Sequence, residues 1–185
     1  DFTSTHAEIN WHMDWATLTA IPAYQSATMA YRAFPALSYS TTDDLGESEA
    51  SYASSLEIRL SNNTDDLKWV LGGYYYDENQ QIHSLIDNGF IQRLSVVGQS
   101  STRSYAGFGQ ATKSIARALR VIAGLRYTHE SKDSDLERYN FAPSAGCYFG
   151  GAPNTPTKCL FDTPTGQVTD SAVNYRGGFE LDLTD

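Results

Sequence analysis

The sequence predicts an all-β fold, namely about seven strands of an antiparallel, transmembrane, up-and-down β-barrel. Three observations favour this fold: apolar and polar residues alternate, the alternating stretches are long, and short and long connections follow one another in turn. The alternation is clearest over residues 56–60, 119–127 and 175–183. Because successive side chains of a strand point to opposite faces, each stretch has one apolar and one polar face. In a membrane barrel the apolar face contacts lipid and the polar face lines the lumen.

The predicted strands are long. They comprise residues 4–12, 16–31, 48–61, 67–82, 101–113, 118–132 and 168–183. Most exceed the roughly 9–11 residues that a tilted strand needs to cross a bilayer. Strands of globular proteins most often have about five or six residues. The lengths therefore favour a membrane barrel over a soluble sheet.

The predicted connections alternate in length. Three short connections comprise residues 13–15, 62–66 and 114–117, and three long ones comprise 33–47, 83–100 and 133–167. Outer-membrane barrels have short periplasmic turns and longer extracellular loops. The strand that begins near Thr5 is therefore predicted to run toward the periplasm.

Aromatic residues gather near both ends of the predicted strands. Trp11, Trp15 and Trp69 lie near the short turns. Those toward the long loops are Tyr31, Phe34, Tyr74, Tyr75, Tyr76 and Tyr127. Because amphipathic rings favour the level of the lipid headgroups, two aromatic girdles are predicted, with ordinary core packing as the alternative.

Composition and charge narrow the function classes. The chain has 185 residues, including 12 Tyr and 14 Gly, and its mean hydropathy is −0.41. No apolar run reaches the ~18 residues of a transmembrane helix. The net charge of −9 argues against binding to nucleic acid or to an anionic membrane surface. Because the chain starts at Asp1 instead of Met and ends at Asp185 just after a predicted strand, we interpret it as a piece of a longer protein, or as the ordered part of one.

Two cysteines, Cys147 and Cys159, lie in a loop-like stretch rich in Gly and Pro. A disulfide between them is predicted for an oxidising compartment, with two free thiols as the alternative. A metal site is not expected, because no further soft ligands lie nearby and the four histidines lack metal-binding spacing.

The sequence does not support a catalytic or cofactor site. The sequence contains neither GxSxG nor a P-loop, and the segment from Gly107 to Gly109 opens no helix, which argues against a dinucleotide site. Three acidic residues stand at alternate positions, a spacing that can bind Ca²⁺: Asp133, Asp135 and Glu137. The glycine that an EF-hand-like loop needs is missing, so we prefer the interpretation of a solvated loop. We therefore expect no enzyme activity and no cofactor.

Six segments carry a family resemblance. They are residues 16–24, 55–61, 68–78, 104–112, 123–128 and 174–180. The fourth reads SYAGFGQAT and the fifth reads AGLRYT. In this order and spacing they resemble the β-barrel of TonB-dependent outer-membrane receptors, in particular the sphingomonad and caulobacter-like group of siderophore receptors. Two residues depart from the pattern: Leu56 stands where Gln is usual, and Lys113 stands where Tyr is usual.

The resemblance implies a larger protein with an N-terminal plug domain, a TonB box and about 22 strands, as in plugged outer-membrane transporters. Residues 1–185 would be a middle part of the barrel, without the plug. The implied function is ligand-gated import across the cell outer membrane, driven by the TonB complex through the plug. The implied partners are outer-membrane lipid, lipopolysaccharide and a small-molecule ligand such as a ferric siderophore. Haem, cobalamin, glycans and plant aromatics remain open as ligands.

The parity of each strand predicts which side chains face the lumen. The lumen-facing set is Glu57, Arg59, Lys68, Gln110, Arg120, Arg126, Arg176, Glu180 and Asp182. Such side chains can hydrate the wall, pair with one another or contact the plug, which are alternatives to ligand binding. Ligand contacts are expected nearer the outer mouth and on the loops, at Tyr76, His83, Tyr139, Tyr148 and Phe149.

Two other classes of protein remain as alternatives. One is a passive porin or a surface-adhesion barrel, which would lack the plug and TonB box in its parent chain. The other is a soluble β-sandwich binding module, which would stay soluble and monomeric without detergent.

Overall fold

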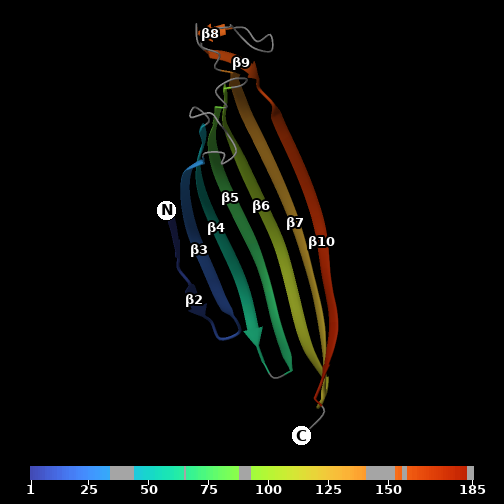
Figure 1. Ribbon diagram of the computed structural model, residues 1–185. Coiled ribbons are helices and arrows are strands. Elements are labelled where there is room, and N and C mark those ends of the chain that lie inside the picture. The colour runs from blue at the N-terminus through green and yellow to red at the C-terminus, as the bar shows by residue number, and fades with distance from the viewer. Residues whose placement is uncertain (34–43, 65, 88–92, 141–152, 156–157, 183–185) are drawn as a thin grey trace.

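The structure is a computed structural model that describes residues 1–33, 44–64, 66–87, 93–140, 153–155 and 158–182. Its strands are β1 (Phe2–His6), β2 (Ile9–His12), β3 (Thr17–Ala33), β4 (Asp44–Asn63), β5 (Leu67–Asp87), β6 (Arg93–Ala116), β7 (Leu119–Asn140), β8 (Pro153–Thr155), β9 (Lys158–Asp162) and β10 (Thr165–Leu181). They form one 10-stranded antiparallel sheet. The sheet is curved and twisted, with β3 to β7 side by side in chain order (Figure 1). The predicted all-β, up-and-down fold is confirmed.

No helix among the described residues is long and apolar enough to cross a membrane.

β1 and β2 both pair with β3, and β9 and β10 both pair with β7, so each of these two pairs forms one interrupted strand. Counted in this way, the sheet has seven long strands and the short β8. Proline accounts for both interruptions. The Ala7 amide donates to the Pro22 carbonyl oxygen at 3.1 Å, but Pro22 has no N–H to return the bond. The Leu136 amide likewise donates to the Pro164 carbonyl oxygen at 3.0 Å. The strand predicted over residues 4–12 is therefore divided.

The three short connections overlap the predicted ranges, although β4 continues to Asn63 and β6 continues to Ala116 inside them. On the other side, the strands extend much further than predicted. β5 ends at Asp87 and β6 begins at Arg93, so the loop predicted over residues 83–100 is mostly a continued hairpin. β7 also continues to Asn140, inside the loop predicted over 133–167. Residues 79–87 contain neither Pro nor Gly to end a strand. Continued pairing also satisfies backbone groups that a loop would leave to water.

The pairing register assigns each side chain to a face, because directly paired residues of an antiparallel ladder lie on the same face. One row across the sheet comprises Trp11, Leu18, Leu60, Leu71, Gly109, Leu125 and Tyr175. We call the face with this row the apolar face and the opposite face the charged face. Ile58 and Val121 also lie on the apolar face, whereas Ile122 lies on the charged face.

The described residues form this one sheet and no second layer that would cover it. Ala53, Ala106 and Ile122 are buried on the charged face, while Leu71 and Leu125 on the apolar face are 60% and 59% exposed. An apolar face of this extent needs an apolar surrounding. In a transmembrane barrel, that surrounding is lipid.

Candidate functional site

A line of tyrosines marks one edge of the apolar face. Each of the strands β3 to β7 contributes one exposed ring, and the five are Tyr24, Tyr52, Tyr75, Tyr105 and Tyr127. Tyrosine favours the boundary between hydrocarbon and water, because its ring is apolar and its hydroxyl is polar. The line therefore marks one limit of the band of exposed apolar side chains on this face.

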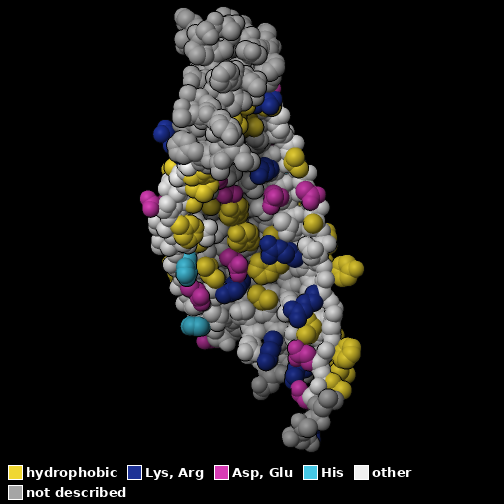
Figure 2. All heavy atoms as spheres, viewed as in Figure 1, with side chains coloured by type: hydrophobic (Ala, Val, Ile, Leu, Met, Phe, Trp, Pro, Cys, Tyr) yellow, Lys and Arg dark blue, Asp and Glu magenta, His cyan; other side chains and the backbone are white. Residues whose placement is uncertain are grey.

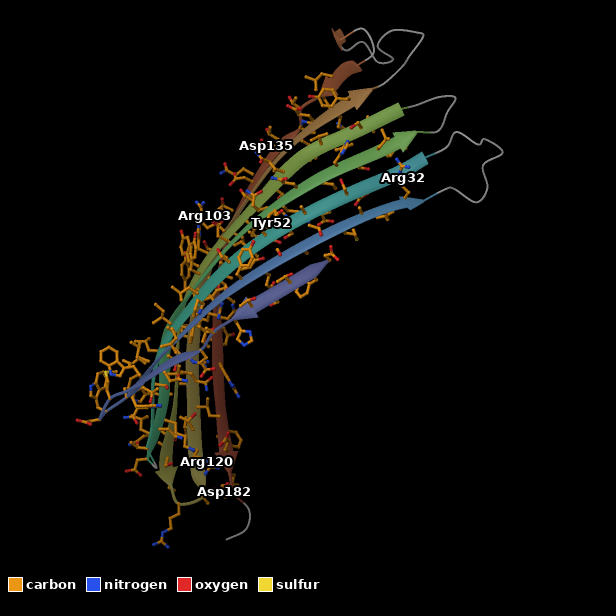
Figure 3. The ribbon with its side chains drawn as sticks, turned by 90° about the vertical axis from the view of Figure 1, so that its left-hand side faces the viewer. Arg32, Tyr52, Arg103, Arg120, Asp135 and Asp182 are labelled. Atoms are coloured by element: carbon orange, nitrogen blue, oxygen red, sulfur yellow. The ribbon has the colours of Figure 1, made fainter. Side chains whose placement is uncertain are left out.

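Charged and polar residues follow directly beyond this tyrosine line. The next apolar-face positions on β5, β6 and β7 are Asp77, Arg103 and His129. Further out, Asp135 lies on the same convex side of the sheet as Arg103 (Figure 3). The change from apolar to charged side chains within two residues indicates a sharp boundary.

The predicted outer girdle is correct in part. Tyr75 and Tyr127 lie on the tyrosine line, but Tyr31, Tyr74 and Tyr76 lie on the charged face. Phe34 lies outside the described residues. Tyr24, Tyr52 and Tyr105 were missed, although each has the same strand parity as the apolar residues around it.

The other edge of the apolar face lies near the short turns. Trp11 and Trp69 lie on this face, and Trp15 lies in the turn between β2 and β3. Trp11 and Trp15 are exposed. Lys113 lies at the same edge, where a lysine can extend its amine to the headgroups. Together these residues form the second boundary of the band.

All nine residues of the predicted lumen-facing set share the charged face, as the register and the Arg120 contacts show. Figure 2 shows this face, with basic and acidic side chains gathered over its lower part. The charges therefore lie opposite the exposed apolar side chains.

Ion pairs connect side chains on the charged face, both between the strands β7 and β10 and along the single strand β4. Arg120 donates from Nε to Glu180 at 2.9 Å and from its two terminal nitrogens to Asp182 at 3.0 and 2.9 Å. These contacts connect the ends of β7 and β10 (Figure 3). Arg59 donates to Glu57 at 3.3 Å. Such half-exposed pairs stabilise a fold only weakly, but they fix the positions of the charged groups.

An arginine held by aromatic rings lies higher on the charged face. The Arg126 guanidinium lies 6.0 Å from the ring centre of Tyr74 and 5.7 Å from that of Phe108, within cation–π range. Phe108 lies across Gly72, where a β-carbon would approach its Cζ to 2.5 Å. Strand parity alone does not predict this contact, because the contact depends on the register between β5, β6 and β7.

The predicted ligand-contact residues lie on both faces. Tyr76 is on the charged face, whereas His83 and Tyr139 follow the parity of the apolar face beyond the tyrosine line. Tyr148 and Phe149 lie outside the described residues. Of the three described residues, only Tyr76 shares the face of the predicted lumen-facing set, and ligand contact at any of these residues stays a prediction.

His83 and Tyr139 each contact a polar neighbour. His83 Nε2 is 3.4 Å from the hydroxyl of the buried Ser95. The Tyr139 hydroxyl donates to the Glu137 carboxylate, and this hydrogen bond, with burial and the nearby negative charge, raises the pKa of Tyr139.

A shallow groove of about 760 Å³ crosses β3 to β7 beyond the tyrosine line. Most of the side chains that line it have the strand parity of the apolar face, among them Gln81, His83, Gln99, Asp135 and Glu137. Its lining contains no Lys or Arg. The lining side chains can form hydrogen bonds, and the Asp135 and Glu137 carboxylates favour a neutral or cationic group over an anion.

Two further points concern metal and sulfur chemistry. Within the described parts of the chain, no group of three or more His, Cys, Asp and Glu side chains could hold a metal ion. Cys147 lies outside the described residues, so its disulfide with Cys159 stays a prediction.

A family model described as "TonB dependent receptor-like, beta-barrel" matches residues 1–185. The chain belongs to this family. It is a family of receptors rather than of enzymes. The TonB-dependent receptor barrel that the resemblance implied is thus confirmed.

Among solved structures, the chain is similar to the ferric yersiniabactin uptake receptor FyuA from Yersinia pestis, with a TM-score of 0.77 and 16% sequence identity. The match covers 100% of this chain and 26% of FyuA, so the chain spans about a quarter of that receptor's length. At this identity the similarity shows the fold alone. A search of curated proteins found no match.

Proposed function

We propose that the parent protein of this chain is an outer-membrane receptor that imports a scarce ligand with energy from TonB. The observation that carries the proposal is the two-faced wall: an apolar face bounded by the tyrosine line on one side and Trp11 and Trp69 on the other, backed by a charged face. Such a wall suits a barrel with lipid outside and water inside. The family of the chain supports the coupling to TonB.

A ferric siderophore is the proposed class of ligand. The similarity in fold to a protein named as a ferric yersiniabactin uptake receptor supports this class. The proposed partners are the TonB complex, acting through a plug domain that residues 1–185 do not contain, and the lipid and lipopolysaccharide around the apolar face. The proposed location is the cell outer membrane.

The test is uptake by cells that express the full-length parent protein under iron limitation. We expect radiolabelled ferric siderophore to accumulate only when both the receptor and TonB are present. Accumulation that is independent of TonB would indicate a passive porin, and binding without accumulation would indicate an adhesion barrel. Either result would reject the proposed import.

Topology provides a further prediction. In a cysteine-free form of the full-length protein, a single cysteine at Gln99, an exposed position beyond the tyrosine line, should react with a membrane-impermeant maleimide on intact cells. A cysteine at Thr64, in the short turn between β4 and β5, should react only after the outer membrane is opened. The reverse pattern would invert the proposed orientation.

The predicted disulfide can be tested separately. A bridge from Cys147 to Cys159 would close a loop of about 13 residues and should stabilise it by roughly 3 kcal/mol in the chain-entropy model. Replacing both cysteines by serine should leave insertion intact, because the β3 to β7 ladder does not include this loop. It should weaken ligand capture. A thiol count on the oxidised, denatured protein checks the bridge, and two free thiols would exclude it.

A further inference from the structure

Arg126 on the charged face has no acidic partner among the described residues of its own wall. Arg59 and Arg120 each pair with carboxylates of the sheet. Arg126 forms no ion pair with any described carboxylate, and its one hydrogen bond to a described side chain runs from Nε to the Thr128 hydroxyl at 3.2 Å. Its two terminal nitrogens therefore remain available as donors.

The wall around Arg126 is complete, so its missing counter-charge cannot come from an absent neighbouring strand. β7 lies between β6 and β10, and Arg126 pairs directly with Phe108 and Asn174. The next charged-face positions on these two strands are Ala106, Gln110, Ala172 and Arg176. None of these neighbours is acidic, so a balancing anion has to approach from the open side of the face.

The guanidinium is held in place by aromatic rings. Tyr74 and Phe108 both lie within cation–π range of Arg126, and Phe108 keeps its place because Gly72 has no side chain. An arginine positioned in this way loses less conformational freedom when it binds a planar anion.

A second cation lies diagonally across from Arg126. Arg176 occupies the charged face of β10, and its Nη1 lies 3.4 Å from Gln110 Oε1. Ionisable side chains that face the interior of a membrane-spanning wall often mark binding sites or transport pathways. Two neighbouring arginines create a positive potential that favours an anion between them.

We propose that Arg126, with the added charge of Arg176, is an oxyanion-binding site on the lumen side of the barrel, and that it takes a carboxylate through its terminal nitrogens. Arginine binds carboxylates with two parallel hydrogen bonds. This inference rests on the proposed function only in that the charged face lines a lumen. The carboxylate can belong to a soluble ligand in transit or to an Asp or Glu of a domain lodged in the barrel.

The test uses the full-length parent protein in detergent, with citrate as the probe. The thermal unfolding midpoint is measured while citrate replaces chloride at constant ionic strength, because an anion that binds the native state raises this midpoint. The variants are Arg126→Gln and Arg126→Lys. Lys68→Gln is the control, because Lys68 is a cation of the same face on β5, away from the aromatic pair.

For a soluble ligand, citrate should raise the midpoint of the wild type and of Lys68→Gln. Arg126→Gln should then weaken citrate binding roughly tenfold or more, with partial recovery in Arg126→Lys. For a carboxylate of the protein itself, the wild type should not respond to citrate. Arg126→Gln should then lower the midpoint more than Lys68→Gln, and high salt should remove the difference.

Equal behaviour of Arg126→Gln and Lys68→Gln in both measurements would overturn the proposal. Neither readout depends on uptake or on TonB. Failure of the proposed import would therefore leave this site standing, and failure of this site would leave import standing.

Discussion

Arginine in place of Leu71 should destabilise the folded barrel in a bilayer by about 2–4 kcal/mol, the cost of an arginine on the lipid face near the midplane. Leu71 lies on the apolar face of β5 between Leu60 and Gly109, and it is 60% exposed. The new guanidinium would therefore enter lipid. The measurement is reversible unfolding of the full-length parent protein in liposomes with increasing urea.

The matched control is Val70→Arg, which places the same charge one residue earlier on the charged face. The arginine can there extend into the hydrated lumen, so its cost should be much smaller. Ile122 is a poorer control, because it is only 8% exposed and an arginine would overfill its site. Equal costs at Leu71 and Val70 would contradict the assignment of the two faces.

Alanine in place of Gly72 should destabilise the barrel by about 1–3 kcal/mol through overpacking. The added β-carbon would lie 2.5 Å from Phe108 Cζ and 2.8 Å from the Ile58 carbonyl oxygen. The ring can shift, but the carbonyl belongs to the ladder between β4 and β5 and cannot move without opening it. Urea unfolding of the full-length protein gives the change in stability.

Gly107→Ala is the control for this substitution. Gly107 lies on the apolar face of β6, and a β-carbon there would meet nothing within 4 Å. Because glycine is entropically unfavourable in a strand, alanine should be neutral or slightly stabilising at this position. A neutral result at Gly72 as well would show that Phe108 does not need the glycine.

The sequence was sufficient to assign faces, because a period of two is a local property of each strand. Glu57, Arg120 and Glu180 were placed on one face by parity alone, and the register confirms that they share it. The same rule also separates His83 from Tyr76, which lie an odd number of residues apart. Their opposite faces could therefore have been predicted.

Cross-strand neighbours could not be predicted from parity. The contact of Arg126 with Phe108 and Tyr74 depends on how three strands are aligned, and local alternation does not fix that alignment. The outward extension of β5 and β6 was missed because residues 83–100 lack a strongly apolar face. Backbone pairing continued there without the alternation that identifies a lipid-facing strand.

A nitroxide scan of β7 in the full-length protein, reconstituted in a bilayer, tests most directly whether the two faces meet lipid and water. Single spin labels are placed at each position from Val121 to Ser131, and their collision rates with oxygen and with a water-soluble nickel complex are measured. We predict oxygen access at 121, 123, 125 and 127, and nickel access at the even positions other than the buried Ile122. Beyond Tyr127, nickel should reach odd and even positions alike. Equal access of both reagents at neighbouring positions within residues 121–127 would contradict a membrane-spanning wall.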